Sequence, residues 1–379
     1  MSKNLITNSG GRSMKLWNGL AAAVVALLAC GPLAAEDRKE LHIYNWSDYI
    51  AEDTIKNFEK ETGIKVTYDV YDSNEVLQGK LSAGSTGYDI VVPSTNFLGK
   101  QIPAGTHQKL DRSKLPNFRN LDPMMLKYVA EVDPGNQYAV PYLWGTVGIG
   151  INVDKVRALL GDNVPLDGWD LLFNPEYMSK LAACGVSFLD SPSEVYPLAL
   201  FYLGKDPNSL DEADYTGAAN ELLMKIRPHI RKFSSSEYIN SLADGEICMA
   251  MGFSGDIGIA KTRAEEAANG VNIRYILPKE GTEIWFDSLA IPADAPNVES
   301  AHVFINYMLR PEVIAEVTDF VTYPNPNKEA TALVDKSLSG DPLVYPPQEQ
   351  IDRMFGLAPK PPKVERVMTR AWTKFKTGR

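Results

Sequence analysis

The sequence has few of the residues that build metal and nucleophilic centres. Its 379 residues include 3 cysteines and 4 histidines. The histidines His42, His107, His229 and His302 are scattered, and there is no Cys-x-x-Cys pair or cysteine–histidine cluster. A structural or catalytic zinc site therefore has nothing to build on, and we expect neither a metal nor a cofactor.

Motifs of the common enzyme classes are also absent. The chain contains no GxxxxGK[ST], no HExxH and no GxSxG, since GFSGD at 252–256 has the wrong spacing. The glycine-rich segment GTVGIG at 145–150 precedes a strand and does not open a helix. A catalytic triad need not be contiguous, so a secreted enzyme using paired acids remains an alternative, but we expect no catalysis.

The chain has fewer basic than acidic residues. Asp and Glu number 48 against 38 Lys and Arg, which gives a formal net charge of -10. This balance argues against binding to nucleic acid or to an anionic membrane surface and favours a small cationic ligand. The length and the 44% hydrophobic content predict an ordinary globular protein of two domains.

Long apolar runs are limited to residues 20–29, LAAAVVALLA, which follow Lys15. A basic residue, a short apolar run and then small residues are typical of a secretory signal peptide, which we assign to residues 1–35. Met14 is an alternative start, and a lipidated Cys30 is an alternative to plain cleavage. We therefore expect the protein in the periplasm.

Cys184 and Cys248 remain after the leader. An even pair in an exported chain favours a disulfide, because the compartment is oxidising. Two buried free thiols are the alternative.

The first third of the mature chain alternates strands and helices. Residues 41–46, 64–70 and 88–94 read as strands, and 50–63 and 73–84 as helices. This βαβαβ order predicts an α/β fold with a parallel sheet, in which ligands bind beyond the carboxyl ends of the strands. We expect the site near Trp46–Ser47 and Pro93–Ser94.

The mixed pattern continues to residue 320. Residues 139–156 suggest two short strands separated by glycines, leading into a second domain. Further strands are predicted within 184–190, 246–256, 271–281 and 284–294. Helices are predicted at 196–204, at 236–245 and, as a pair broken at Pro311, over 299–320. The tail is rich in proline.

Aromatic residues and acids coincide four times at predicted strand ends. They occur in WSDY (46–49), in FSGD (253–256), in WFD (285–287) and at Tyr323. Aromatic faces flanked by carboxylates suit a flexible alkyl ammonium ligand, because the rings cover methylenes while the acids accept the ammonium hydrogens. For any single aromatic the competing interpretation is a core residue.

Long ordered segments resemble the periplasmic polyamine-binding proteins that feed ABC importers. These segments include NWSDYI, FEKETGIKVTYDVYDSNEVL, GYDIVVPS, PYLWGTVGIGINVDKV and EYINSLADGEICMAMGFSGD. The resemblance extends from about residue 41 to residue 379.

The resemblance implies a two-lobe binding protein of type II, with a mixed sheet and flanking helices in each lobe and a hinge between them. The implied parts are 36–143 (lobe 1, first part), 144–270 (lobe 2, first part), 271–318 (lobe 1 return) and 319–379 (lobe 2 return and tail). It also implies a ligand site between the lobes formed by Trp46, Ser47, Asp48, Tyr49, Ser94, Glu194, Phe253, Asp256, Trp285, Asp287 and Tyr323.

The same resemblance implies ABC permease subunits as partners and a monomeric state. The broad face of Trp285 favours spermidine or a mixed profile over putrescine alone. A polyamine-sensing protein of the same fold, signalling to a membrane receptor, is the alternative function.

Overall fold

In the computed structural model, which describes residues 39–379, nine strands join in a sheet of order β2-β1-β3-β9-β4-β7-β5-β6, with β8 beside β4. The strands are β1 (Glu40–Trp46), β2 (Lys65–Tyr71), β3 (Ile90–Val91), β4 (Ala139–Asn152), β5 (Val186–Phe188), β6 (Lys232–Phe233), β7 (Met249–Phe253), β8 (Ile273–Ile276) and β9 (Ile284–Ala290). The predicted signal peptide (1–35) and Cys30 lie outside the described residues.

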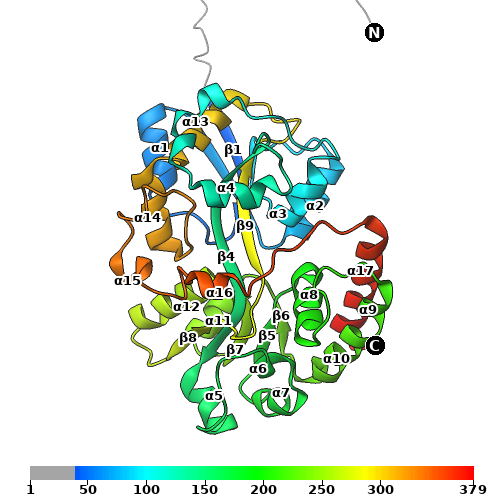
Figure 1. The fold of residues 1–379 in the computed structure, drawn as a ribbon. Coiled ribbons are helices and arrows are strands. Elements are labelled where there is room, and N and C mark those ends of the chain that lie inside the picture. Colours follow the sequence, from blue (N-terminus) through cyan, green and yellow to red (C-terminus); the bar gives the residue numbers. More distant parts are fainter. Residues whose placement is uncertain (1–38) are drawn as a thin grey trace, which may run out of the picture. The chain divides into compact units, whose positions relative to one another are not determined.

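Helices surround this sheet, so the predicted α/β class is confirmed (Figure 1). They are α1 (Thr54–Thr62), α2 (Asn74–Ala83), α3 (Thr95–Gln101), α4 (Pro123–Ala130), α5 (Val153–Leu160), α6 (Asp170–Phe173), α7 (Pro175–Leu181), α8 (Pro192–Tyr202), α9 (Glu212–Thr216), α10 (Ala218–Ile226), α11 (Tyr238–Ala243), α12 (Ser254–Glu266), α13 (Val298–Met308), α14 (Pro311–Val321), α15 (Lys336–Ser339), α16 (Gln348–Ile351) and α17 (Pro362–Thr377).

The predicted βαβαβ unit is confirmed, because β1 pairs in parallel with both β2 and β3. Local signals explain its helices. Gly63 ends α1 in the left-handed conformation (φ 72°), and the Ser73 side chain caps α2 by accepting a hydrogen bond from the Val76 N–H. The carboxyl ends of these strands therefore meet at one edge of the sheet.

Strand β4 differs from the prediction of two short strands, since it runs unbroken through its glycines and is buried along its whole length. The glycines serve close packing and not a break. A Cβ on Gly145 would lie 2.7 Å from the indole of Trp285. A larger residue here would displace that ring.

The two halves of β4 have different neighbours. Residues 139–146 pair with β9, whereas residues 147–152 pair with β7 and β8. Residues 149–151 of β4 pair with both β7 and β8, so β4 lies between these two strands in the sheet half that also holds β5 and β6. In Figure 1, β4 and β9 run between the upper and lower groups of elements. These groups are joined by continuous strands.

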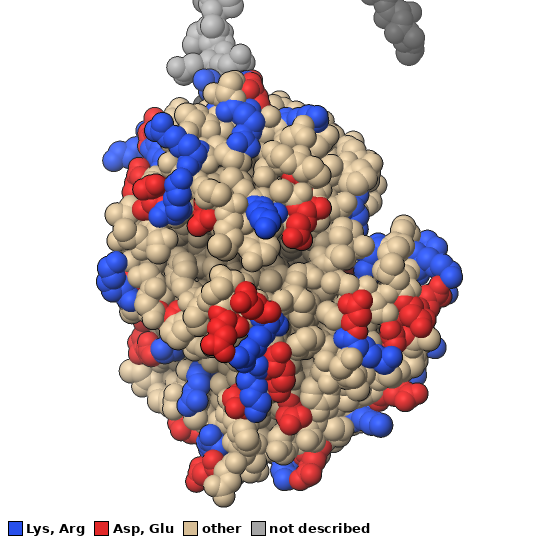
Figure 2. Space-filling model, viewed as in Figure 1, with Lys and Arg blue, Asp and Glu red and all other residues tan. Residues whose placement is uncertain are grey.

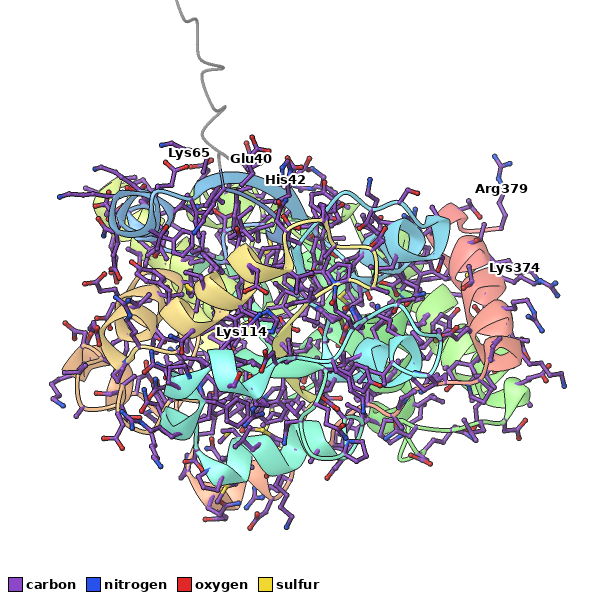
Figure 3. The ribbon with its side chains drawn as sticks, turned by 90° about the horizontal axis from the view of Figure 1, so that it is seen from above. Glu40, His42, Lys65, Lys114, Lys374 and Arg379 are labelled. Carbon is purple, nitrogen blue, oxygen red and sulfur yellow. A yellow bond between two sulfur atoms is a disulfide. The ribbon has the colours of Figure 1, made fainter. Side chains whose placement is uncertain are left out.

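Helix α17 was not predicted from the proline-rich tail. It begins after Pro361, which is compatible with a helix start, and it buries Val364, Met368, Trp372 and Phe375 at helical spacing. It packs against α9 and α10. In Figure 3, Lys374 and Arg379 project outward from this end of the chain.

The predicted disulfide between Cys184 and Cys248 is present, with Cα atoms 5.5 Å apart. It joins the segment before β5 to the residue before β7, two strands that pair in parallel. The cross-link therefore ties the segment before β5 to the start of β7, the strand whose far end carries Phe253.

The face of the molecule shown in Figure 2 carries interspersed acidic and basic side chains. Within residues 39–379, no helix combines the length and apolar character needed to cross a bilayer.

Candidate ligand-binding site

A cavity with an empty volume of about 480 Å³, partly open to solvent, lies where the two groups of strands meet. We call it the central cavity. It is lined by Trp46, Ser47, Tyr49, Tyr71, Asp72, Asn74, Ser94, Glu194, Ser235, Ser236, Ile239, Phe253, Asp256, Trp285, Asp287 and Tyr323. Trp46, Tyr71 and Phe253 are the last residues of β1, β2 and β7, so the cavity lies at the carboxyl strand ends where the sequence predicts a site.

Every side chain predicted for the site lines the central cavity except Asp48. Asp48 is exposed and has a positive φ of 52°. Its carboxylate pairs with Arg263 of α12 at 2.5 Å. Asp48 is therefore not among the residues that line the central cavity, and its expected part in ligand binding stays a prediction.

Aromatic rings form a continuous wall. The Phe253 ring centroid lies 6.4 Å from that of Trp46 and 5.8 Å from that of Trp285. Trp285 lies 5.4 Å from Tyr323, which contacts Tyr49 at 5.1 Å. The successive edge-on contacts leave ring faces available for a methylene chain or a cation.

Glycine is required where this wall meets α12. A Cβ on Gly258 would approach the Thr322 hydroxyl to 2.2 Å. Thr322 itself has a positive φ of 57° and donates a hydrogen bond to the Gly255 carbonyl at 2.8 Å. The next residue is Tyr323. Small residues in α12 therefore let the segment that carries Tyr323 pack closely against this helix.

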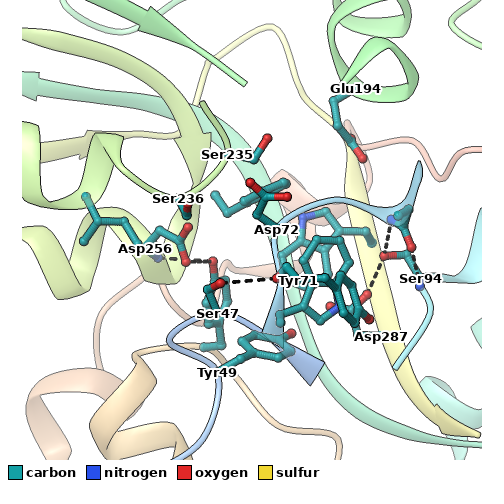
Figure 4. Close-up of a pocket in the computed structure, with 16 residues that line it drawn as sticks. Ser47, Tyr49, Tyr71, Asp72, Ser94, Glu194, Ser235, Ser236, Asp256 and Asp287 are labelled. Atoms are coloured by element: carbon teal, nitrogen blue, oxygen red, sulfur yellow. Dashed lines mark hydrogen bonds between the residues drawn. The ribbon is translucent and has the colours of Figure 1, made fainter. Parts of the chain in front are cut away.

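Asp256 lies in the first turn of α12 and is 7% exposed. Its two carboxylate oxygens accept hydrogen bonds from the hydroxyls of Tyr323 and Tyr238, each at 2.6 Å. Burial raises the pKa of Asp256 to about 7, although these hydrogen bonds favour its charged form. The carboxylate is held in a fixed orientation (Figure 4).

Asp287 on β9 is 3% exposed. It accepts a hydrogen bond from Ser94 at 2.5 Å, and Asn74 donates to the same Ser94 hydroxyl at 2.9 Å (Figure 4). Burial raises the pKa of Asp287 to about 7, against the opposing effect of the Ser94 hydrogen bond. Asp287 lacks a buried counter-charge, because no basic side chain lines the cavity.

Glu194, in the first turn of α8, points toward the cavity from the side opposite Asp256 (Figure 4). It is 5% exposed, and its Oε2 has no donor among the described residues. Burial raises its pKa. A buried carboxylate oxygen without a donor is costly, and an ammonium group would satisfy it.

Sequence reasoning missed six lining residues. They are Tyr71, Asp72, Asn74, Ser235, Ser236 and Ile239. The strand-end rule could have found Tyr71 and Asp72, which follow the predicted strand 64–70, whereas the two serines follow β6, a strand that the sequence did not predict.

The charge of the lining is one-sided. Asp72, Glu194, Asp256 and Asp287 line the cavity, with no Lys, Arg or His. No group of three or more potential metal-ligating side chains occurs within residues 39–379. The chemistry of this lining is that of a receptor for an organic cation with an apolar body.

Comparisons with known proteins agree with this fold. A model of the bacterial extracellular solute-binding protein family matches residues 53–345. The putrescine-binding periplasmic protein PotF of Escherichia coli (strain K12) is 57% identical over 366 residues, which cover 96% of this chain and 99% of the relative. The putrescine-binding periplasmic protein SpuD of Pseudomonas aeruginosa (strain UCBPP-PA14) is 54% identical over 360 residues, covering 95% and 98%.

A solved structure is also similar. The putative spermidine/putrescine ABC transporter from Listeria monocytogenes superposes with a TM-score of 0.81 at 34% identity, covering 90% of this chain and 100% of that chain. The fold is thus the type II periplasmic binding protein fold. The chain belongs to the bacterial extracellular solute-binding protein family.

Proposed function

We propose that this protein captures a polyamine in the central cavity and delivers it to an ABC permease in the inner membrane. The observation that carries the proposal is the cavity itself, which combines an aromatic wall with carboxylates on opposite sides and no basic side chain. A diammonium ligand would place one ammonium group at the acids on each side of the cavity, which a neutral sugar would not. An amino acid would need a cation for its carboxylate.

The ligand would lie with one ammonium group at Asp256 and the other near Asp287 and Glu194. Between them, Trp46, Phe253 and Trp285 would cover the methylenes. The raised pKa values of Asp256 and Asp287 are those of an unpaired site. A bound cation would lower both, so the ligand and the charged carboxylates stabilise one another.

Putrescine is the ligand we propose first. Relatives at 57% and 54% identity are named as putrescine-binding proteins, and a spermidine/putrescine-binding relative from Escherichia coli is 39% identical. The broad indole of Trp285 favours the longer triamine, so spermidine is the competing ligand. Length selectivity would follow from the separation between Asp256 and the Asp287–Glu194 side.

Capture would use closure of two lobes about β4 and β9. We propose that the elements around β1–β3 form one lobe and those around β5–β8 the other. Side chains already join the two groups on either side of the cavity. Asp48 pairs with Arg263, and the Ser193 hydroxyl donates to Glu75 at 2.8 Å. A ligand touching both groups would stabilise the closed form.

We further propose that the protein acts in the periplasm as a monomer after removal of residues 1–35, without catalysis and without nucleic acid. The relatives are named as periplasmic binding proteins. The net charge of -10 disfavours phosphate backbones. Recovery of the polyamine unchanged after incubation would exclude the enzyme alternative.

The test is calorimetric titration of refolded, ligand-stripped protein with putrescine, cadaverine, agmatine, spermidine and spermine. Stripping is needed because bound ligand would mask titration. We expect one-to-one binding that is tightest for putrescine. An absence of heat with all five amines, from protein shown to be folded and empty, would refute the proposal. Copurification with a permease, in place of a membrane receptor, would separate transport from sensing.

A further inference from the structure

The first turn of α8, which carries Glu194, is hydrogen-bonded to an acid of α2. This acid is Glu75, the second residue of its helix. The Glu75 Oε1 accepts a hydrogen bond from the Ser193 hydroxyl at 2.8 Å and one from the Ser191 hydroxyl at 3.3 Å. Both serines are buried, and their hydroxyls also contact each other at 3.0 Å. We call these three side chains the Glu75 cluster.

The Glu75 cluster replaces the usual cap of α8. Ser191 is the N-cap residue of this helix, but its side chain caps none of the helix N–H groups. An N-cap serine ordinarily accepts a hydrogen bond from the N–H two or three residues further on. Here the Ser191 hydroxyl donates to Glu75, and the Glu75 Oε1 accepts the Ser193 N–H at 3.4 Å. A carboxylate at this position also suits the helix dipole. Glu75 therefore serves as the cap of α8.

This cap comes from a distant part of the molecule. Glu75 and Ser193 are 118 positions apart in the chain. Helix α2 belongs to the upper group of elements in Figure 1, and α8 belongs to the lower group. None of the three side chains of the Glu75 cluster lines the central cavity. Separation of the two groups would break these hydrogen bonds together without any direct contact to a ligand.

The residue before Glu75 supports the other acid on this side of the cavity. The Asn74 amide donates to the Ser94 hydroxyl at 2.9 Å, and this hydroxyl donates to Asp287 at 2.5 Å. The Ser94 N–H in turn donates to the Asn74 side chain at 3.2 Å. Consecutive residues of α2 therefore contact the support of Asp287 and the helix start that carries Glu194. The Glu75 cluster fixes the second of these acids relative to the first.

We propose that Glu75 is a positioning residue that caps α8 from the opposite lobe and so holds Glu194 in place when the central cavity is closed. The inference rests on the proposed lobe closure and polyamine binding. Glu75 acts through the cap and does not touch the ligand. Loss of the cap lowers the fraction of protein in the binding-competent form, and the apparent affinity falls in proportion to that fraction. The loss should be the same for every ligand held at Glu194.

Ser193→Ala tests the proposal without a change of charge. It removes the shortest hydrogen bond of the Glu75 cluster and introduces a strong helix former. By calorimetry, we expect putrescine to bind about tenfold more weakly, and every other amine that the unmodified protein binds to lose the same factor. Stopped-flow fluorescence should show most of the loss as faster dissociation, because the closed form opens more readily. An unchanged affinity, or a loss confined to one amine, would overturn the proposal.

A double-mutant cycle shows whether the two residues act together. In a Glu75→Ala background, Ser193→Ala should weaken putrescine binding by less than about twofold, because the acceptor is already absent. A repeated tenfold loss in that background would overturn the proposal. Melting temperatures of the ligand-free variants show whether each is folded.

Glu59→Gln is the matched control within one group of elements. Glu59 of α1 accepts hydrogen bonds from the Lys65 ammonium at 3.1 Å and from the Val66 N–H at 2.9 Å, both in β2. It therefore resembles Glu75 but does not join the two groups. We expect putrescine affinity within about twofold of the unmodified protein. A loss equal to that of Ser193→Ala would show that bridging the groups is not the cause, and would overturn the proposal.

Lobe closure can also be followed without any ligand. Spin labels on Lys80→Cys of α2 and Lys225→Cys of α10, at two exposed positions, report the distance between the groups by double electron–electron resonance. We expect a closed, short-distance component whose share falls about tenfold in Ser193→Ala. A component that is absent, or that Ser193→Ala leaves unchanged, would overturn the inference even if polyamines bind. A fall as expected, in a protein that binds no polyamine, would instead refute the proposed function and the ligand role of Glu75.

Discussion

The two sides of the central cavity hold their acids by different means. On one side, Asp256 accepts a tyrosine hydroxyl on each oxygen, both at 2.6 Å. On the other side, Glu194 is buried and its Oε2 has no donor among the described residues. We call these the tyrosine side and the glutamate side.

The difference lies in how far each buried carboxylate is stabilised before a ligand arrives. The tyrosine side uses neutral donors that stabilise the charge before a ligand arrives, so its electrostatic contribution is preorganised. On the glutamate side, one carboxylate oxygen of Glu194 has no such donor among the described residues. Its charge is less stabilised in the empty protein, and more of the stabilisation must come from the ligand itself. We therefore expect the tyrosine side to anchor the ligand and the glutamate side to adjust its affinity.

The substitution expected to have the largest effect is Asp256→Asn, which tests the tyrosine side. We expect putrescine binding to weaken by about two orders of magnitude, close to 3 kcal/mol, because an ammonium group would be left without its charged partner. The amide can still hydrogen-bond to Tyr238 and Tyr323, so the free energy of unfolding of the ligand-free protein should change by about 1 kcal/mol or less. Calorimetry and thermal melting measure the two effects. A large drop in melting temperature with little loss of affinity would assign Asp256 to the fold.

The pH dependence tests both sides together. With pKa values of about 7 in the empty protein, Asp256 and Asp287 are mostly charged at pH 8 and mostly protonated at pH 6. If the bound cation keeps both charged, each contributes about tenfold, so affinity should fall by up to about 100-fold from pH 8 to pH 6. Titrations in buffers of different ionisation enthalpy should show proton release near pH 7.

Stability of the empty protein should change in the opposite direction with pH. The pKa values of Asp256 and Asp287 are higher in the folded state than in the unfolded chain, so the folded state binds more protons between pH 4 and pH 7. Their contribution to stability is present at low pH and is lost as the pH rises through about 7. Saturating putrescine should remove this trend in melting temperature. A trend that persists with ligand would mean that the cation does not pair with these acids.

Glu194→Gln tests the glutamate side alone and should have a smaller effect. We expect about a tenfold loss of putrescine affinity, since Asp287 remains on that side to accept the ammonium group. Replacing a buried charge by an amide should leave the free energy of unfolding unchanged or slightly increased. Calorimetry on Glu194→Gln and Asp256→Asn under the same conditions gives the ratio of the affinity losses on the two sides. Equal losses would mean that the two sides anchor the ligand alike.

Much of this architecture could be predicted from the sequence because its signals are local. Alternating strands and helices gave the parallel unit of β1, β2 and β3, and Ser73 and Gly63 marked helix ends. Strand-end aromatics paired with acids identified most of the cavity wall. These patterns depend on nearest neighbours in the chain, which propensity and periodicity describe.

What could not be predicted depends on contacts between distant segments. The glycines of β4 suggested a break, but Gly145 exists to let the Trp285 indole approach. The orientation of Asp48 is set by a residue of α12, Arg263.

Asp48→Asn provides the matched control for both sides. Like the substitutions of Asp256 and Glu194, it removes one carboxylate near the site. This carboxylate lies outside the central cavity and pairs with Arg263. Both side chains of the pair are about one-third exposed. A pair of this exposure contributes about 0–1 kcal/mol. We therefore expect putrescine affinity to change by no more than about fivefold, which is the smallest of these effects. At high salt the affinities of the variant and the unmodified protein should differ even less.

A loss comparable to that of Asp256→Asn would mean that the Asp48–Arg263 pair holds the closed form. Arg263→Gln should then reproduce the loss, whereas a direct role of the Asp48 carboxylate in binding the ligand would leave Arg263→Gln near the unmodified affinity.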